Sequence, residues 1–131
     1  MTANAAPLEK HEQAAFVQWL ELQGLLFSAT AQSTFTTSWN QKRLNHTTGL
    51  RKGVPDMLVI ISPEQSKDGE RYILFIEMKR LKGGVVSKEQ KHWIAAINDG
   101  DPTAAAYVCK GAAEAIKTIS HYLKTVDNSI F

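Results

Sequence analysis

The sequence predicts an α/β fold in which helices flank a central mixed β-sheet, and three observations lead to this fold class. Apolar residues recur at helical spacing near the start of the chain and twice in its second half, which indicates amphipathic helices. Short, continuously apolar runs lie between these stretches, as is typical of buried strands. Hydrophobic residues make up 44% of the 131 residues and charged residues 21%, a composition that fits a folded domain and argues against disorder.

Composition excludes several classes of protein. The chain carries 15 Lys and Arg against 13 Asp and Glu, so it is not a histone-like polycation. Cys109 is the one cysteine and cannot form an internal disulfide or a Cys-rich zinc site, so we expect a reducing, cytoplasmic setting. The N-terminus lacks the apolar region of a signal peptide, and the longest aliphatic runs are too short to span a membrane. Because no repeat, low-complexity tract or linker is found, residues 1–131 are expected to form a single domain.

Residues 8–23 are predicted to form the first helix, which Gly24 closes as a C-cap. The apolar stripe of this helix consists of Leu8, Ala15, Phe16, Trp19 and Leu20. Glu12 lies on the same stripe, four residues after Leu8 and four before Phe16. An acid on an apolar face is unusual, although a carboxylate at the edge of the stripe can simply reach solvent.

Residues 25–37 are predicted to be extended, because Thr and Phe are frequent there and no helical period is present. The polar stretch that follows belongs to a segment without any acidic residue, residues 22–55. The cations of this segment that are candidates for binding the phosphates of a nucleic acid are Lys42, Arg43, His46, Arg51 and Lys52. The prediction depends on their single sign of charge, since solubility alone does not require it. The alternative is a solvated loop.

Two strands are predicted next, at residues 56–62 and 71–80, and the turn residues Asp68-Gly69 between them favour a hairpin. The second strand is apolar on both faces, which is typical of a central strand covered on both sides. This apolar character stops at Glu77, so Glu77 and Lys79 share one face at the end of the strand.

The rest of the chain is predicted to form a helix, a strand and a helix. Residues 87–98 read as a helix with Ser87 as N-cap and Gln90 as its capping-box partner. Residues 103–109 fit a short strand, and residues 112–124 carry the apolar period of a last amphipathic helix.

The predicted hairpin places Asp56 and Glu77 together, because the start of one antiparallel strand lies beside the end of the other. Two neighbouring carboxylates repel each other unless a cation lies between them, and oxygen ligands favour Mg²⁺ or Mn²⁺ over zinc. Lys79 would then hold a phosphate or act on an attacking water. Each piece alone has an ordinary structural interpretation: Pro-Asp as a turn, Glu77 with Lys79 as a surface ion pair, and Gln90 as a cap.

The ordered set Gly53-Val-Pro-Asp56, Ile76-Glu77-Met-Lys79 and Ser87-x-x-Gln90-x-x-Trp93 resembles the VRR-Nuc family of PD-(D/E)xK nucleases. The resemblance spans about residues 8–110. It implies a restriction-endonuclease-like core and Mg²⁺- or Mn²⁺-dependent hydrolysis of DNA phosphodiester bonds.

The resemblance also implies roles for individual residues. Asp56 and Glu77 match the metal ligands, Lys79 matches the catalytic lysine, and Gln90 matches the active-site glutamine of the following helix. Glu12 matches the acid that the first helix contributes to the site, acting on the metal directly or through a water molecule. The backbone carbonyl of Met78 is implied as a further metal ligand.

Small stand-alone members of this family, mostly from phages or bacteria, resemble Holliday-junction resolvases and pair as homodimers. The resemblance therefore implies a homodimer that cuts four-way junctions in a bacterial or phage-infected cell, since symmetric incision needs two sites related by a two-fold axis. Aromatic and apolar residues expected at the dimer interface are Phe35, Trp39, Ile130 and Phe131. The alternatives are a nuclease-fold module that binds DNA without cutting it and a monomeric flap or other structure-selective nuclease; a metalloenzyme of another kind fits the acid-free segment poorly.

Overall fold

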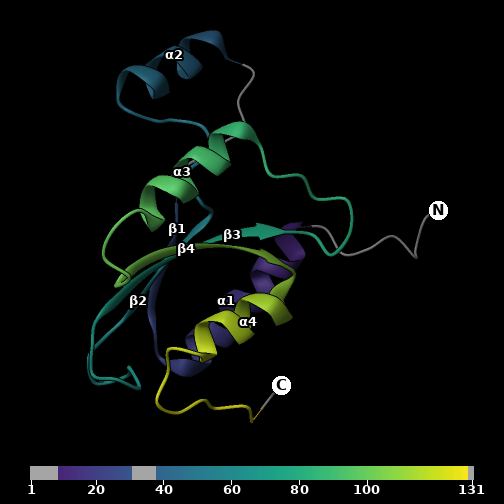
Figure 1. Cartoon of the computed structure of the whole chain (residues 1–131). Coiled ribbons are helices and arrows are strands. Elements are labelled where there is room, and N and C mark those ends of the chain that lie inside the picture. Colours follow the sequence, from purple (N-terminus) through teal and green to yellow (C-terminus); the bar gives the residue numbers. More distant parts are fainter. Residues whose placement is uncertain (1–8, 31–37, 130–131) are drawn as a thin grey trace, which may run out of the picture.

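The computed structural model describes residues 9–30 and 38–129, which fold around one four-stranded sheet (Figure 1). The strands are β1 (Leu26–Ala29), β2 (Met57–Ile61), β3 (Tyr72–Lys79) and β4 (Ala104–Lys110), in that spatial order. β1, β2 and β3 pair antiparallel, whereas β3 and β4 are parallel. The predicted mixed sheet and the predicted β2–β3 hairpin are therefore both present.

The helices lie on both faces of the sheet (Figure 1). α1 (Glu9–Gln23) and α4 (Ala112–Ser120) pack against each other and against β3 on one face. α3 (Lys88–Asn98) packs on the other face against β4, and it connects β3 to β4, as a parallel pair requires. None of the helices in the described part of the chain has the length and apolar character needed to cross a membrane.

The core lies between the sheet and the pair α1 and α4. Leu74, Ile76 and Met78 alternate along β3 and are fully buried on this side. Phe16 and Trp19, which belong to the predicted stripe of α1, stack on each other and are fully buried as well. This packing fixes the position of α1 relative to the sheet. It thereby also positions the residues at the N-terminus of α1.

One helix lies in the polar stretch, for which the sequence predicts no regular structure. α2 (Trp39–Thr47) begins at the N-cap Ser38, whose side chain accepts a hydrogen bond from the Gln41 N–H. None of its residues is buried, and Trp39 and Leu44 are mostly exposed. Because α2 buries no apolar face, it has no periodic pattern by which the sequence could have indicated a helix.

Two other predicted segments agree with the structure in part. The extended stretch predicted for residues 25–37 contains the strand Leu26–Ala29, and residues 31–37 lie outside the described residues. The last helix ends at Ser120 rather than at residue 124. The chain turns away there because residues 122–124 pair instead with the turn after β2, through Lys67 N–H to Tyr122 O and Lys124 N–H to Gln65 O.

Candidate active site

The start of β2 and the end of β3 lie side by side. Met57 pairs with Ile76, so Asp56 just before β2 lies beside Glu77 near the end of β3. Asp56 Oδ2 accepts a hydrogen bond of 2.8 Å from the Met78 N–H, which fixes the carboxylate against the neighbouring strand. The antiparallel hairpin thus brings together the two acids whose convergence the sequence predicted.

Glu77 is the most buried acid of this site, with only 1% of its surface exposed. Its Oε2 accepts a 2.7 Å hydrogen bond from Gln90 Nε2 and lies 3.3 Å from Lys79 Nζ. Its Oε1 is buried and has no hydrogen-bond partner among the described residues. Since a buried polar atom left without a partner costs about 1–3 kcal/mol, and more when charged, this oxygen is suited to bind a cation.

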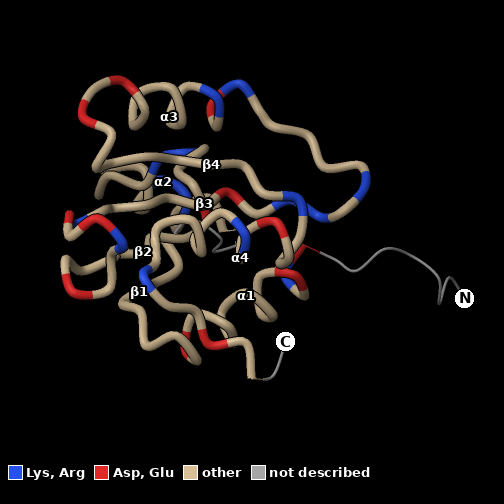
Figure 2. Tube along the Cα trace, turned by 60° about the horizontal axis from the view of Figure 1, so that its bottom comes forward, with Lys and Arg blue, Asp and Glu red and all other residues tan. Residues whose placement is uncertain are grey.

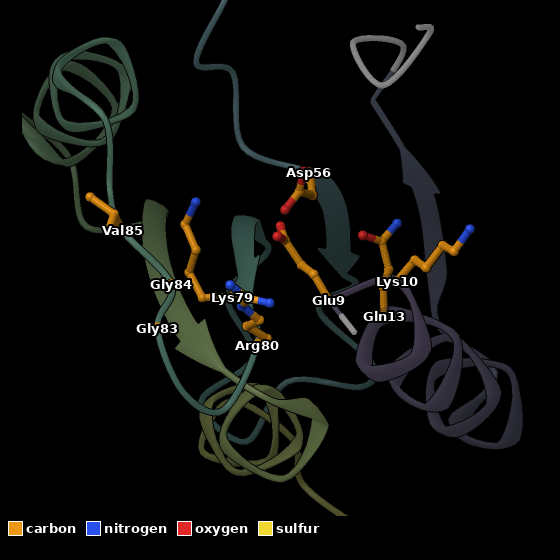
Figure 3. Close-up of a pocket in the computed structure, with 9 residues that line it drawn as sticks. All are labelled: Glu9, Lys10, Gln13, Asp56, Lys79, Arg80, Gly83, Gly84 and Val85. Carbon is orange, nitrogen blue, oxygen red and sulfur yellow. The ribbon is translucent and has the colours of Figure 1, made fainter. Parts of the chain in front are cut away.

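Glu9, at the start of α1, adds a third carboxylate. One carboxylate oxygen from each of Glu9, Asp56 and Glu77 lies within 4.8 Å of the other two. Figure 3 shows the carboxylates of Glu9 and Asp56 pointing toward each other across a pocket. We call these three residues the acidic cluster. Sequence reasoning missed Glu9; the signal available for it was its place one turn before Glu12 on the same helix.

Glu12 is not brought into the acidic cluster. Its Oε1 accepts a 2.8 Å hydrogen bond from the N–H of Ala112, the first residue of α4. The preceding residue, Gly111, has no side chain with which to cap that helix, and a Cβ there would lie 2.9 Å from Glu12 Oε1. The carboxylate therefore caps a helix N-terminus, where a negative charge is favourable. This position corrects the expected placement of Glu12 beside the metal ligands.

The pKa values of all three carboxylates are raised, chiefly because these side chains are buried. Burial raises the pKa of Glu77 from 4.5 to about 7, and the charge of Asp56 adds to this effect. Burial also raises the pKa of Asp56, although the Met78 N–H opposes the shift. The pKa of Glu9 rises because of burial and the nearby charge of Asp56. A bound cation would offset this repulsion, so the cluster is better suited to a metal complex than to three bare charges.

The acidic cluster fits a hard divalent cation. All three side chains offer carboxylate oxygens, the ligands preferred by Mg²⁺ and Mn²⁺, and Glu77 Oε1 is a buried oxygen to which no residue of 9–30 or 38–129 donates a hydrogen bond. Asp56, Lys79 and Glu9 border an open pocket of about 560 Å³. Lys10 and Arg80 also line it, so positive charge lies close to the acids (Figure 3).

Gln90 both caps α3 and contacts the acidic cluster, the two interpretations that the sequence left open. Its N–H donates to Ser87 Oγ and its Oε1 accepts from the Ser87 N–H, so the predicted capping box is present. The remaining amide nitrogen is the one that binds Glu77. Gly53 keeps this helix close to the loop before Asp56: its φ is +93°, and a Cβ there would lie 2.5 Å from the Glu89 carbonyl carbon.

The residues predicted to bind DNA lie outside the pocket. Lys42, Arg43 and His46 are exposed on α2, and Lys52 is exposed in the following loop. Arg51 is exposed too, but its Nη1 donates to the His46 and Leu50 carbonyl oxygens, near the end of α2. Figure 2 marks the Lys and Arg residues of α2 together with those between β3 and α3. Positive charge thus lies on α2 and the loop after it as well as at the pocket.

Comparison with known proteins agrees with this architecture. The VRR-NUC domain family matches residues 3–113, so the chain belongs to that family. A solved structure described as a VRR_NUC domain protein is 20% identical to the chain, over 94% of this chain and 93% of the other, with a TM-score of 0.70. No curated protein matches the sequence. The chain thus has the nuclease-type α/β fold that its motifs resemble.

Proposed function

We propose that the chain is a Mg²⁺- or Mn²⁺-dependent endonuclease that hydrolyses DNA phosphodiester bonds. The observation that carries this proposal is the acidic cluster, in which one buried Glu77 oxygen has no partner within the described part of the chain while Lys79 lies 3.3 Å from the other oxygen. Glu9, Asp56 and Glu77 would hold the metal; the Met78 carbonyl remains a predicted fourth ligand. When bound, such a cation polarises a phosphate oxygen and lowers the pKa of a bound water.

The protein groups around the acidic cluster would position the reactants. Lys79 presents its ammonium to the pocket, where it would hold the scissile phosphate or orient the attacking water. Gln90 holds Glu77 Oε2 and so keeps the other oxygen directed to the metal. Asp56 is fixed by the Met78 N–H. Glu12 would act at a distance, by joining α1 to α4, rather than as a ligand.

The test is cleavage of labelled DNA in Mn²⁺, with a four-way junction beside flap and linear substrates and EDTA as the control. Metal-dependent cutting of any of these supports the nuclease. Binding without cutting under every condition would instead favour a nuclease-fold module that only holds DNA.

We further propose that the basic residues of α2 and the loop after it bind phosphates beyond the pocket. The double variant Lys42→Gln/Arg43→Gln is expected to weaken binding of all DNA structures. It should also flatten the plot of log K against log salt by about one unit for each lost contact, because each contact releases counterions. Fluorescence anisotropy at several salt concentrations measures both effects.

The matched control is Lys67→Gln/Lys124→Gln, which removes two exposed charges near the opposite end of the β2–β3 hairpin. It should leave the slope close to that of the unmodified protein. An unchanged slope in the α2 variant would mean that this segment is only a solvated helix.

The last part of the proposal is a cytoplasmic homodimer that resolves four-way junctions. Trp39 is 73% exposed on α2, so it is available to a second copy. The other residues expected at the interface, Phe35, Ile130 and Phe131, lie outside the described residues. Light scattering of the protein, alone and with junction, should give twice the chain mass of 14.5 kDa. A monomer in both samples would leave a monomeric structure-selective nuclease.

A further inference from the structure

Gly84 differs from the other glycines of the chain. All eight lie within the described residues, and seven of them have a positive φ, which favours glycine over any other residue. Gly84 is the exception, so its backbone conformation does not explain why it is glycine. Its surroundings do: a Cβ at this position would lie 3.0 Å from Lys79 Cβ, 3.3 Å from Cδ and 3.4 Å from Cγ.

The turn after β3 therefore lies against the side chain of Lys79. Figure 3 shows Gly83 and Gly84 beside Lys79 at the wall of the pocket. Lys79 is only 7% exposed although it borders this open pocket, and the backbone of Gly84 covers part of its methylene stem. Burying the stem in this way limits the rotamers that the lysine can adopt.

Lys79 has little freedom to yield to a larger neighbour. Its carbonyl accepts a 2.8 Å hydrogen bond from the Gly111 N–H, and its residue pairs with Lys110 in the parallel ladder. A methyl group at residue 84 would consequently displace the stem or the turn by a few tenths of an ångström. Displacing the stem would change the position of the ammonium relative to Glu77 Oε2, which is now 3.3 Å distant.

We propose that Gly84 is a positioning residue that holds the Lys79 ammonium at the acidic cluster. This inference rests on the proposed catalytic role of Lys79. A geometry that is slightly wrong can slow a reaction without weakening substrate binding, because the reacting groups must be aligned in the transition state. Gly84→Ala should therefore lower kcat by about 10-fold or more and leave KM and DNA affinity close to those of the unmodified protein.

The decisive experiment combines this kinetic split with a measurement that needs no activity. Lysine-specific acylation followed by mass spectrometry reports how accessible each ammonium is. Lys79 should be protected in the unmodified protein and react faster in Gly84→Ala. The exposed residues Lys117 and Lys124 serve as internal standards and should react equally in both. Unchanged labelling of Lys79 or an unchanged kcat overturns the proposal.

A double-mutant cycle measured by thermal unfolding tests the proposal if Gly84→Ala folds poorly. Lys79→Gly removes all three atoms that a Cβ at residue 84 would crowd. Gly84→Ala should then lower Tm in the unmodified background and have little effect in the Lys79→Gly background. An equal decrease in both backgrounds would mean that another neighbour resists the methyl group, and the proposal would fail. Absence of cleavage by the unmodified protein would contradict the proposed function instead, while labelling and stability would still report on Gly84.

Discussion

Replacing Asp56 by Asn is expected to abolish metal-dependent DNA cleavage and, at neutral pH, to stabilise the metal-free protein. Both effects have one cause. Asp56 supplies a carboxylate oxygen to the acidic cluster, and its charge helps to raise the pKa values of Glu77 and Glu9. An amide keeps an oxygen for the Met78 N–H but removes the charge that attracts the cation and repels the other acids.

The raised pKa of Glu77 predicts the direction in which the stability of the metal-free protein changes with pH. The pKa of Glu77 is about 7 in the folded protein against an ordinary 4.5, so the folded state holds its proton more tightly than the unfolded chain does. The stability of the metal-free protein should therefore be highest below pH 4.5, as far as this group is concerned, and fall as the pH rises toward 7. In Asp56→Asn the fall should be smaller, because one source of the raised pKa is gone.

Thermal unfolding with and without Mn²⁺, together with calorimetric titration, measures these effects. At a Mn²⁺ concentration about 100 times the dissociation constant, the unmodified protein should gain about 2.7 kcal/mol of stability. Asp56→Asn should lose most of this gain, and Glu77→Gln should behave likewise toward metal. Glu64→Gln, which changes an exposed acid in the turn after β2, should behave as the unmodified protein does. Mn²⁺ affinity that survives Asp56→Asn would refute the assignment of Asp56 as a ligand.

Lys79→Ala is expected to lower kcat by about 100- to 1000-fold while DNA binding survives, because a fixed charge at the reacting centre contributes far more to the transition state than to affinity. One lysine is also a small share of the phosphate contacts, so its loss changes the salt dependence of binding little. Lys79→Met is the sharper variant. It keeps an apolar stem under Gly84 and removes only the ammonium.

Cleavage rates at saturating DNA and binding by anisotropy separate the two effects. Lys117→Ala, an exposed lysine on α4, is the control for loss of a positive charge and should retain the kcat of the unmodified protein. If Lys79→Met cut DNA normally, or if Lys79→Met failed to fold, the lysine would be better explained as a structural partner of Glu77.

Much of the fold could be predicted from the chain because its signals are local. β3 is apolar on both faces up to Glu77, and α3 carries a complete capping box, so each element is evident from residues a few positions apart. The convergence of Asp56 and Glu77 follows from strand pairing alone, since a hairpin joins the start of one strand to the end of the next. Lys79 then lies on the same face as Glu77 through the two-residue period of the strand.

Tertiary packing decided which acid of α1 lies beside Asp56 and Glu77. Glu9 and Glu12 lie three residues apart, on neighbouring parts of one helix face, and nothing in the local pattern separates them. The contact of α1 with α4 takes Glu12 to the N–H of Ala112 and leaves Glu9 beside Asp56. Only the tertiary structure shows α2, which buries no apolar stripe, and only the tertiary structure explains Gly84, which lies against the stem of Lys79. The periodicity of the sequence determines which helices and strands form. Which residue of another element a side chain contacts depends on how those elements pack.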